Sequence, residues 1–377
     1  MRLQTCCFVL LTLALSARHA EAGPEVSLGG YLDADVWGDA DGNLFTNQEL
    51  DLGTKLAWSE AVSVNMYATI VAGSIPAGGG RPGERWASVQ FDGLDLTWQT
   101  GAGTLTIGDL VYQYGAFDYY FYKRLSMITP ERFTRGVSFS FGGSQLTQTV
   151  LVGVADLADE PVTYQVRSLS TEIIELTGSE PASLSNAADI AAATELTFAE
   201  TQSLALYYGA RSDIVLPYDK TGSLFAGMEY TGSLGEMLAL KADFGYRSIG
   251  EGSNTFSVLL EPALNLGDFS IATSYYQFFD PDETGMNYVG DELYGYIEPG
   301  YSFNETVALG LPLELHTAEE TAAEEAMVDR SAFWAVPTLY LYPADGIAWW
   351  LWAQAVVPFA DNGDNAYGMG SEIIVEF

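Results

Sequence analysis

Apolar and polar residues alternate along most of the chain with a period of two, not the 3.6 of a helix. Near the N-terminus Val26, Leu28 and Leu32 are separated by small or polar residues, and the same spacing recurs at 50–58 and 62–70. A strand with one apolar and one polar face gives this pattern, because successive side chains point to opposite sides of the backbone. These stretches reach about nine residues or more, whereas globular strands average about five or six. The sequence therefore predicts an all-β protein with long strands.

The alternation continues to the last residue and predicts about eighteen strands, with sixteen as the alternative count. The strand at 86–98 changes phase between Phe91 and Leu94, which predicts a β-bulge near Gly93. The predicted strands after residue 70 cover 86–98, 104–113, 134–141, 144–155, 190–198, 202–212, 222–231, 237–248, 254–265, 268–279, 292–303, 306–316, 331–342, 347–358 and 366–377.

Three prolines, Pro262, Pro312 and Pro337, fall inside predicted strands. Proline cannot donate a ladder hydrogen bond, so each position is expected to mark a bulge or a local break in pairing. Because the apolar and polar pattern continues on both sides of each proline, the prediction of a strand stands at all three.

The predicted connections alternate between short and long. Tight turns such as 142–143 and 266–267 alternate with long stretches such as 114–133 and 156–189. Outer-membrane barrels keep short turns on the periplasmic side and long loops outside, and single-chain bacterial barrels use an even number of strands. The sequence therefore predicts a transmembrane antiparallel up-and-down β-barrel, and a secreted β-sandwich or β-helix is the alternative.

The first residues have the order of a secretory signal peptide. Arg2 precedes the apolar run Cys6–Leu15, and Ala20–Ala22 provides a small-residue cleavage site. We expect residues 1–22 to be removed and 23–377 to form a single barrel domain. Both cysteines lie in the apolar run, so the mature chain is expected to have neither disulfides nor thiolate metal sites.

Charge narrows the range of partners. The chain has 15 basic and 50 acidic residues, a net charge of −35, and removal of Arg2, Arg18 and Glu21 changes this value to −36. Such negative charge argues against binding nucleic acid, which selects basic surfaces. No apolar segment after Ala22 approaches the roughly 18 residues that a transmembrane helix needs.

The last twelve residues, AYGMGSEIIVEF, resemble the C-terminal strand signal of Gram-negative outer-membrane barrels. The apolar face of this segment consists of Tyr367, Met369, Ile373, Val375 and Phe377. The opening segment EVSLGGYLDADVWGD resembles the first strand of trimeric general porins. A resemblance to the porin class implies a place in the cell outer membrane among its lipids. It also implies recognition of Tyr367, Ile373, Val375 and Phe377 by the barrel-assembly machinery, and a homo-oligomer such as a trimer.

If apolar positions face lipid, the opposite parity lines the lumen, and carboxylates predominate there. The acidic members are Asp33, Asp35, Asp51, Asp92, Asp95, Glu229, Asp243, Glu261, Glu298, Glu314, Glu372 and Glu376, and the basic members are Lys55, Arg211, Lys241 and Arg247. Rings of carboxylates favour cations in a pore, so the wall predicts a mild cation preference. The alternative is that these groups only keep the lumen wet.

The segment from Tyr112 to Arg135 is basic and rich in aromatic residues, unlike its surroundings. It contains the third long connection, and in the porins that the chain resembles the third extracellular loop folds into the barrel and narrows it. The resemblance therefore implies that 114–133 is inserted in the lumen, and the alternative is that it lies outside and pairs with acidic loops or lipid headgroups. The constriction residues so implied are Tyr119, Tyr120, Tyr122, Lys123, Arg124, Arg132 and Arg135.

Large aromatic residues near strand ends are typical of the girdles that barrels place at membrane interfaces. A sugar-binding site is the alternative, and Tyr31 and Trp37, with lumen parity, are its candidates. The expected girdle residues are Trp58, Trp86, Trp98, Trp334, Tyr340, Trp349, Trp350, Trp352 and Tyr367.

Catalysis has little support in the sequence. His316 is the only histidine after residue 22, and the chain contains no GxSxG motif, no phosphate-binding glycine loop and no His/Cys metal cluster. We expect no catalytic residue, cofactor or metal ion. The sequence favours a channel for passive diffusion of small hydrophilic solutes or ions. The alternative is a surface barrel that acts as an adhesin or binds polysaccharide.

Overall fold

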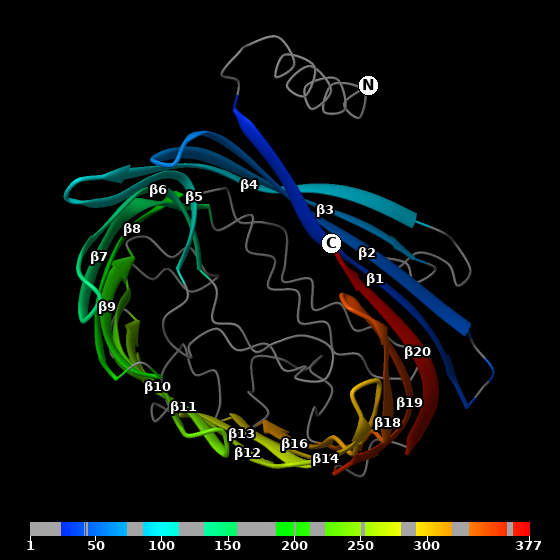
Figure 1. The fold of residues 1–377 in the computed structure, drawn as a ribbon. Helices are drawn as coiled ribbons and strands as arrows, with labels where there is room; N and C mark the ends of the chain where they lie inside the picture. The colour runs from blue at the N-terminus through cyan, green and yellow to red at the C-terminus, as the bar shows by residue number, and fades with distance from the viewer. Residues whose placement is uncertain are drawn as a thin grey trace.

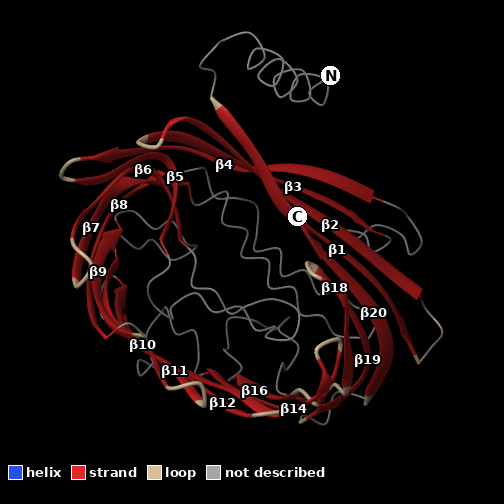
Figure 2. Ribbon diagram, viewed as in Figure 1, coloured by secondary structure: helices blue, strands red, loops and turns tan. Residues whose placement is uncertain are grey.

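The computed structural model describes residues 24–40, 42, 44–73, 86–112, 132–156, 186–199, 201–211, 223–249, 253–279, 292–318, 332–359 and 365–377. The described residues form β-strands joined by turns (Figure 2). No helix among them is long and apolar enough to span a membrane. The strands are β1 Glu25–Asp39, β2 Leu44–Ser59, β3 Val62–Gly73, β4 Trp86–Thr100, β5 Gly103–Tyr112, β6 Arg132–Gly142, β7 Leu146–Asp156, β8 Asn186–Ala199, β9 Gln202–Arg211, β10 Ser223–Leu234, β11 Leu238–Ile249, β12 Ser253–Leu266, β13 Phe269–Phe279, β14 Glu292–Asn304, β15 Val307–Gly310, β16 Leu313–Ala318, β17 Ala332–Ala335, β18 Thr338–Ala344, β19 Ile347–Pro358 and β20 Ala366–Glu376.

The sheet closes on itself because its first and last strands pair. β1 and β20 are antiparallel, from Tyr31 opposite Glu376 to Asp39 opposite Gly368. Beyond the end of β20, the backbones of Gly30 and Phe377 exchange two hydrogen bonds of 3.1 Å. Figure 1 shows the two strands side by side, the first in blue and the last in red. The predicted antiparallel barrel is confirmed.

Two prolines explain why 20 strand segments make 18 crossings of the wall. β15 and β16 follow one another along β14, separated by Leu311 and Pro312. β17 and β18 follow one another along β19, separated by Val336 and Pro337. The two gaps are adjacent, since the amide of Val336 donates to the carbonyl oxygen of Pro312 at 2.8 Å. The strands predicted at 306–316 and 331–342 are therefore present, but each is interrupted at its proline.

The predicted bulge lies in β4. Gly93 is opposite Tyr67 of β3 and Phe91 is opposite Ala68, which leaves Asp92 as the extra residue. The bulge reverses the parity of the strand at this point, because one added residue exchanges the inner and outer faces.

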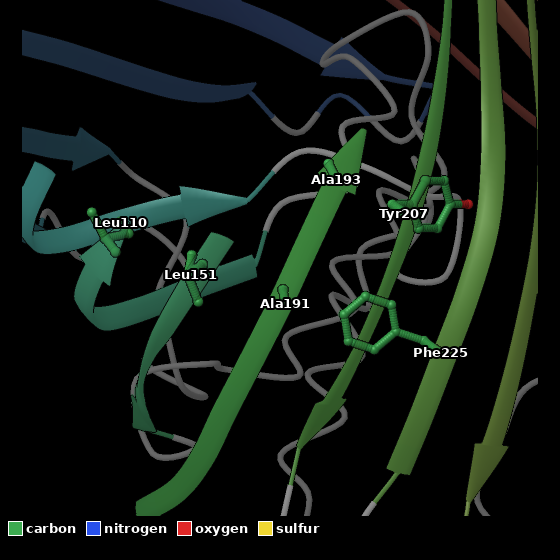
Figure 3. Close-up of a cluster of buried hydrophobic side chains, with 6 residues drawn as sticks. All are labelled: Leu110, Leu151, Ala191, Ala193, Tyr207 and Phe225. Atoms are coloured by element: carbon green, nitrogen blue, oxygen red, sulfur yellow. The ribbon is translucent and has the colours of Figure 1, made fainter. Parts of the chain in front are cut away.

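Exposure separates the two faces of the wall. Val152 and Ile190 are 52% and 53% exposed, whereas their neighbours Leu151 and Ala191 are each 3% exposed. The outward positions are mostly apolar in all parts of the barrel, as expected of a surface that meets lipid instead of water. Some inward positions are also apolar: Figure 3 shows one such cluster, formed by Leu110, Leu151, Ala191, Ala193, Tyr207 and Phe225.

Candidate pore wall

The inward parity of the strands carries the carboxylates that the sequence predicted for a pore wall. Asp35, Asp95, Asp243, Glu314 and Glu372 are all buried on the inner face, although they lie on five different strands. Their outward neighbours are mostly apolar. Each of these five strands thus contributes a carboxylate to the inner face through the simple alternation of its side chains.

Three carboxylates meet where the barrel closes. Asp35 of β1 is opposite Glu372 of β20, and carboxylate oxygens of Asp33, Asp35 and Glu372 all lie within 4.8 Å of one another. Like charges this close raise the local negative potential, and a cation in the lumen is attracted to it. Glu372 and the two aspartates come from opposite ends of the sequence, so only the closure of the sheet brings them together.

Neutral groups orient several carboxylates of the wall. Asp51 accepts a hydrogen bond from the hydroxyl of Thr69 at 2.6 Å, and Asp95 accepts one from the side-chain amide of Asn65 at 2.7 Å. Asp243 accepts a bond of 2.9 Å from the phenol of Tyr207. A hydroxyl or amide donor holds a carboxylate in place without adding a positive charge that would cancel its own.

A tyrosine pair does the same for Glu298 on the opposite part of the wall. The phenol of Tyr340 donates to Glu298 at 2.6 Å, and the phenol of Tyr296 donates to its other carboxylate oxygen. Trp350 packs edge-on against Tyr340 with ring centroids 5.5 Å apart. These tyrosine partners of Glu298 were not predicted from the sequence. Their inward parity was visible, but their contact with Glu298 depends on the register between strands.

Positive charge on the described inner face is sparse. Lys241 Nζ lies 3.4 Å from Glu229 Oε2, and Lys55 is exposed with the same parity as Asp51. The side chains of Asp92, Arg211 and Arg247, also predicted to line the wall, lie outside the described part of the structure. Carboxylates therefore outnumber ammonium groups among the described side chains of the wall.

Comparisons with known proteins agree on the fold alone. No family model matches the chain, and no curated protein matches it. Several solved outer-membrane barrels match its structure. A BenF-like porin from Pseudomonas fluorescens Pf-5 has a TM-score of 0.59 at 10% identity, covering 94% of this chain and 98% of that one.

OpdK of Pseudomonas aeruginosa, in a structure with vanillate, has a TM-score of 0.57 at 14% identity and the same coverage. OccAB4 of Acinetobacter baumannii has a TM-score of 0.54 at 10% identity, again with 94% and 98% coverage. The chain has the fold of an outer-membrane porin. At these identities the likeness establishes the architecture, and the chemistry of the pore has to come from the residues of this chain.

The segment expected to narrow this porin-type barrel is described only at its end. Tyr119, Tyr120, Tyr122, Lys123 and Arg124 lie outside the described residues, and Arg132 begins β6 with its side chain not described.

The expectation that Arg135 faces the lumen is wrong. The inward neighbour of Arg135, Thr134, is buried and donates a 2.5 Å hydrogen bond to Asp189. Arg135 takes the opposite parity, its side chain is 70% exposed, and its Nε lies 2.6 Å from Asp109 Oδ1. Arg135 therefore belongs to the outer face of the wall and not to a constriction.

The predicted aromatic girdle divides between the two faces. Trp58, Trp98, Trp349 and Tyr367 are exposed on the outer face, as expected for an interface belt. The remaining members are Trp334, Tyr340, Trp350 and Trp352, which take the inward parity, and Trp86, whose side chain is not described. Four inward aromatic residues thus belong to the pore wall instead of the girdle.

Trp37, a candidate for stacking on sugars, is covered by protein. Its ring stacks on Phe45 with centroids 5.6 Å apart, and it belongs to a cluster with Val336, Trp352 and Val356. Only 8% of its surface is exposed. The ring of Trp37 therefore stabilises the wall and offers little face to a solute.

Proposed function

We propose that this protein is an outer-membrane channel that passes small hydrophilic solutes by diffusion and prefers cations. The observation that supports this proposal best is the set of inward carboxylates, such as Asp51 and Asp95, that are held by neutral donors. Fixed negative charge on the wall of a narrow aqueous pore raises the local concentration of cations. Catalysis has no part in this mechanism.

The negative charge of the wall is expected to select among solutes by their charge. One porin of similar fold was solved with vanillate, an aromatic carboxylate. In this chain the carboxylates of Asp33, Asp35 and Glu372 lie within 4.8 Å of one another on the inner face. An anionic solute would be repelled there, so we expect this barrel to favour cationic or neutral solutes even though its fold is shared.

The proposal has three further parts. The segment 114–133 narrows the lumen, and its basic residues lie across the pore from the acidic wall. Residues 1–22 direct the chain across the inner membrane and are then removed. The strand that ends at Phe377 is read by the barrel-assembly machinery, and the finished barrel associates with copies of itself in the lipid of the outer membrane.

Planar-bilayer recording with purified, folded protein tests the channel. We expect stable ohmic steps and, in a salt gradient, a reversal potential of the sign that cation preference gives. Replacing Lys241 with Gln should increase this preference, because Glu229 loses the ammonium group 3.4 Å away. The increase should be clear near 0.1 M salt and largely absent near 1 M, where the Debye length falls from about 10 Å to about 3 Å.

Two results would count against this function. A folded sample that never opens a stable conductance would contradict the channel itself, and retention of that sample on insoluble polysaccharide would then favour an adhesin. A reversal potential that favours anions would leave the channel in place but contradict the role given to the acidic wall.

A further inference from the structure

The wall of the barrel divides between β4 and β5, in the half that carries the long connections. The two strands pair only from Asp95–Thr100 with Gly103–Gly108. Over the rest of their described residues, Trp86–Leu94 pairs with β3 and Asp109–Tyr112 pairs with β6. Figure 1 shows the result, with β4 running beside β3 while β5 lies against β6. We call these two edges, which do not pair with one another, the seam.

A side chain ends the ladder at the fork of the seam. Asp109 is the first residue of β5 beyond the paired part, and its Oδ2 accepts a hydrogen bond of 2.9 Å from the amide of Leu94. Its Oδ1 accepts a 2.6 Å bond from Arg135 Nε. The carboxylate thus takes the place of the backbone carbonyl that a continued ladder would have offered to Leu94. The β4–β5 ladder therefore ends where the backbone amide of Leu94 has a side-chain partner, and this amide is not left without a hydrogen bond.

The backbone beside this terminus is fitted to it. Gly108 has a φ of +135°, and a Cβ there would overlap the carbonyl oxygen of Leu94 and lie 2.8 Å from Cα of Asp95. Only glycine allows both the conformation and the close approach. The fork is therefore built into the sequence at Gly108 and Asp109.

The polar backbone edges of the seam need either water or protein beside them. Open sheet edges are not found facing lipid at membrane depth, because their backbone groups have no partner there; they occur where protein covers them or where they line a water-filled cavity. The ion pair of Asp109 and Arg135 lies on the outer face at this point, with the arginine side chain 70% exposed. Charged groups on the lipid face of a barrel are unfavourable unless water accompanies them.

Apolar side chains lie beside the seam on each face. Val89 and Phe91 on the outer side of β4 are exposed. On the inner side the first described residue of β5 past the fork is Leu110, which belongs to the apolar cluster shared with Leu151 and Ala191 (Figure 3). An apolar molecule in the seam would meet apolar side chains both toward the membrane and toward the lumen, with the polar backbone edges between them.

We propose that the seam is a lateral opening through which small apolar or amphipathic solutes pass between the lumen and the outer part of the membrane. This inference rests on the proposed function only in requiring an open lumen. Hydrophilic solutes follow the axis of the barrel past the acidic wall, whereas molecules with an apolar surface leave or enter through the side. The barrel then has two routes, an axial one for hydrophilic solutes and a lateral one for solutes with an apolar surface.

A cross-link across the seam tests this route. In cells that produce the double variant Phe91→Cys with Val111→Cys, oxidation should close the seam, and the mature chain is expected to contribute no other cysteine. We expect entry of the apolar dye N-phenylnaphthylamine into these cells to fall severalfold on oxidation and to recover on reduction. The conductance of the purified variant in planar bilayers should stay unchanged. Leu96→Cys with Ile107→Cys is the matched control, because these residues are already opposite one another in the paired part.

Each outcome bears on the lateral route. Unchanged dye entry at complete cross-linking would overturn it, and so would a parallel fall of dye entry and conductance, which would place both solutes in the axial pore. If the cysteines do not oxidise, pyrene maleimide on Phe91→Cys alone should block dye entry, and the same label on the outward-facing Val152→Cys should not; equal effects would also overturn the proposal. A protein without conductance whose dye entry is still blocked at the seam would contradict the proposed channel and leave the seam in place.

Discussion

The missing side chain at Gly370 leaves room for two tryptophans on the inner face of the wall. A Cβ at this residue would overlap the indole ring of Trp352 and lie 2.8 Å from Cβ of Trp37. The two rings come from β1 and β19, on either side of β20. The absence of a side chain in β20 is therefore what lets its neighbours pack across it.

This packing predicts that Gly370→Ala destabilises the barrel. We expect a loss of about 1–3 kcal/mol, typical of adding atoms to a well-packed site, measured as a lower midpoint of urea unfolding in lipid vesicles. Gly295→Ala is the matched control, because a Cβ there would meet only Leu315 Cβ at 3.9 Å, an ordinary contact. Equal midpoints for the two variants would show that Trp37 and Trp352 move aside at little cost.

At the scale of the strand, the sequence predicts most of the architecture. The strand predicted at 347–358 is β19, Ile347–Pro358, and the one predicted at 202–212 is β9, Gln202–Arg211. Alternation is decisive in a membrane barrel because every strand must present one face to lipid and the other to the lumen. For the same reason the phase change between Phe91 and Leu94 predicted a bulge near Gly93, and the extra residue is its neighbour Asp92.

The site was harder to predict, because its contacts depend on register and on runs without alternation. Trp349 and Trp350 are adjacent and face opposite sides of the wall. Because both residues are tryptophan, the sequence alone does not show which one faces lipid. Asp35 and Glu372 are opposite one another only through closure. For Arg135 the signal was present: it shares the parity of Val137, but its charge and its place in a basic segment suggested the lumen instead.

The basic residues of 114–133 lead to a prediction about ion preference. Replacing Lys123, Arg124 and Arg132 together with Gln should increase cation preference if 114–133 narrows the pore, because three positive charges leave the lumen. The reversal potential in a salt gradient measures the change. Arg135→Gln is the control: its side chain lies on the outer face, so ion preference should stay as in the unmodified protein. An unchanged triple variant would place the segment outside the pore.

At the scale of the whole molecule, the last strand closes the barrel and is proposed to be recognised during assembly. It closes the barrel against β1, and its outward face bears the apolar residues that resemble an assembly signal. Tyr367, Ile373 and Phe377 are exposed there, so their side chains add little to the packing of the wall. Their importance is therefore expected in the delivery of the chain to the membrane rather than in the stability of the finished barrel.

Phe377→Ala separates these roles. We expect less assembled barrel in cells, detected as loss of the heat-modifiable band in gels, but unchanged spontaneous refolding into lipid vesicles. Phe303→Ala should affect neither, although Phe303 is 59% exposed and Phe377 is 57% exposed. A matching loss in both assays for Phe377→Ala would assign the residue to folding itself and not to recognition by the assembly machinery.

The closure of the sheet also bears on how the barrel forms, and we expect it to be a late step. The pairing of β1 with β20 joins the first and last described strands, so this contact closes the longest loop in the sheet and needs β20 to be present. The same step brings Asp33, Asp35 and Glu372 within 4.8 Å of one another. Electrostatic repulsion is therefore greatest at the final step of assembly, and salt that screens these charges should speed the closing of the barrel more than the pairing of its earlier strands.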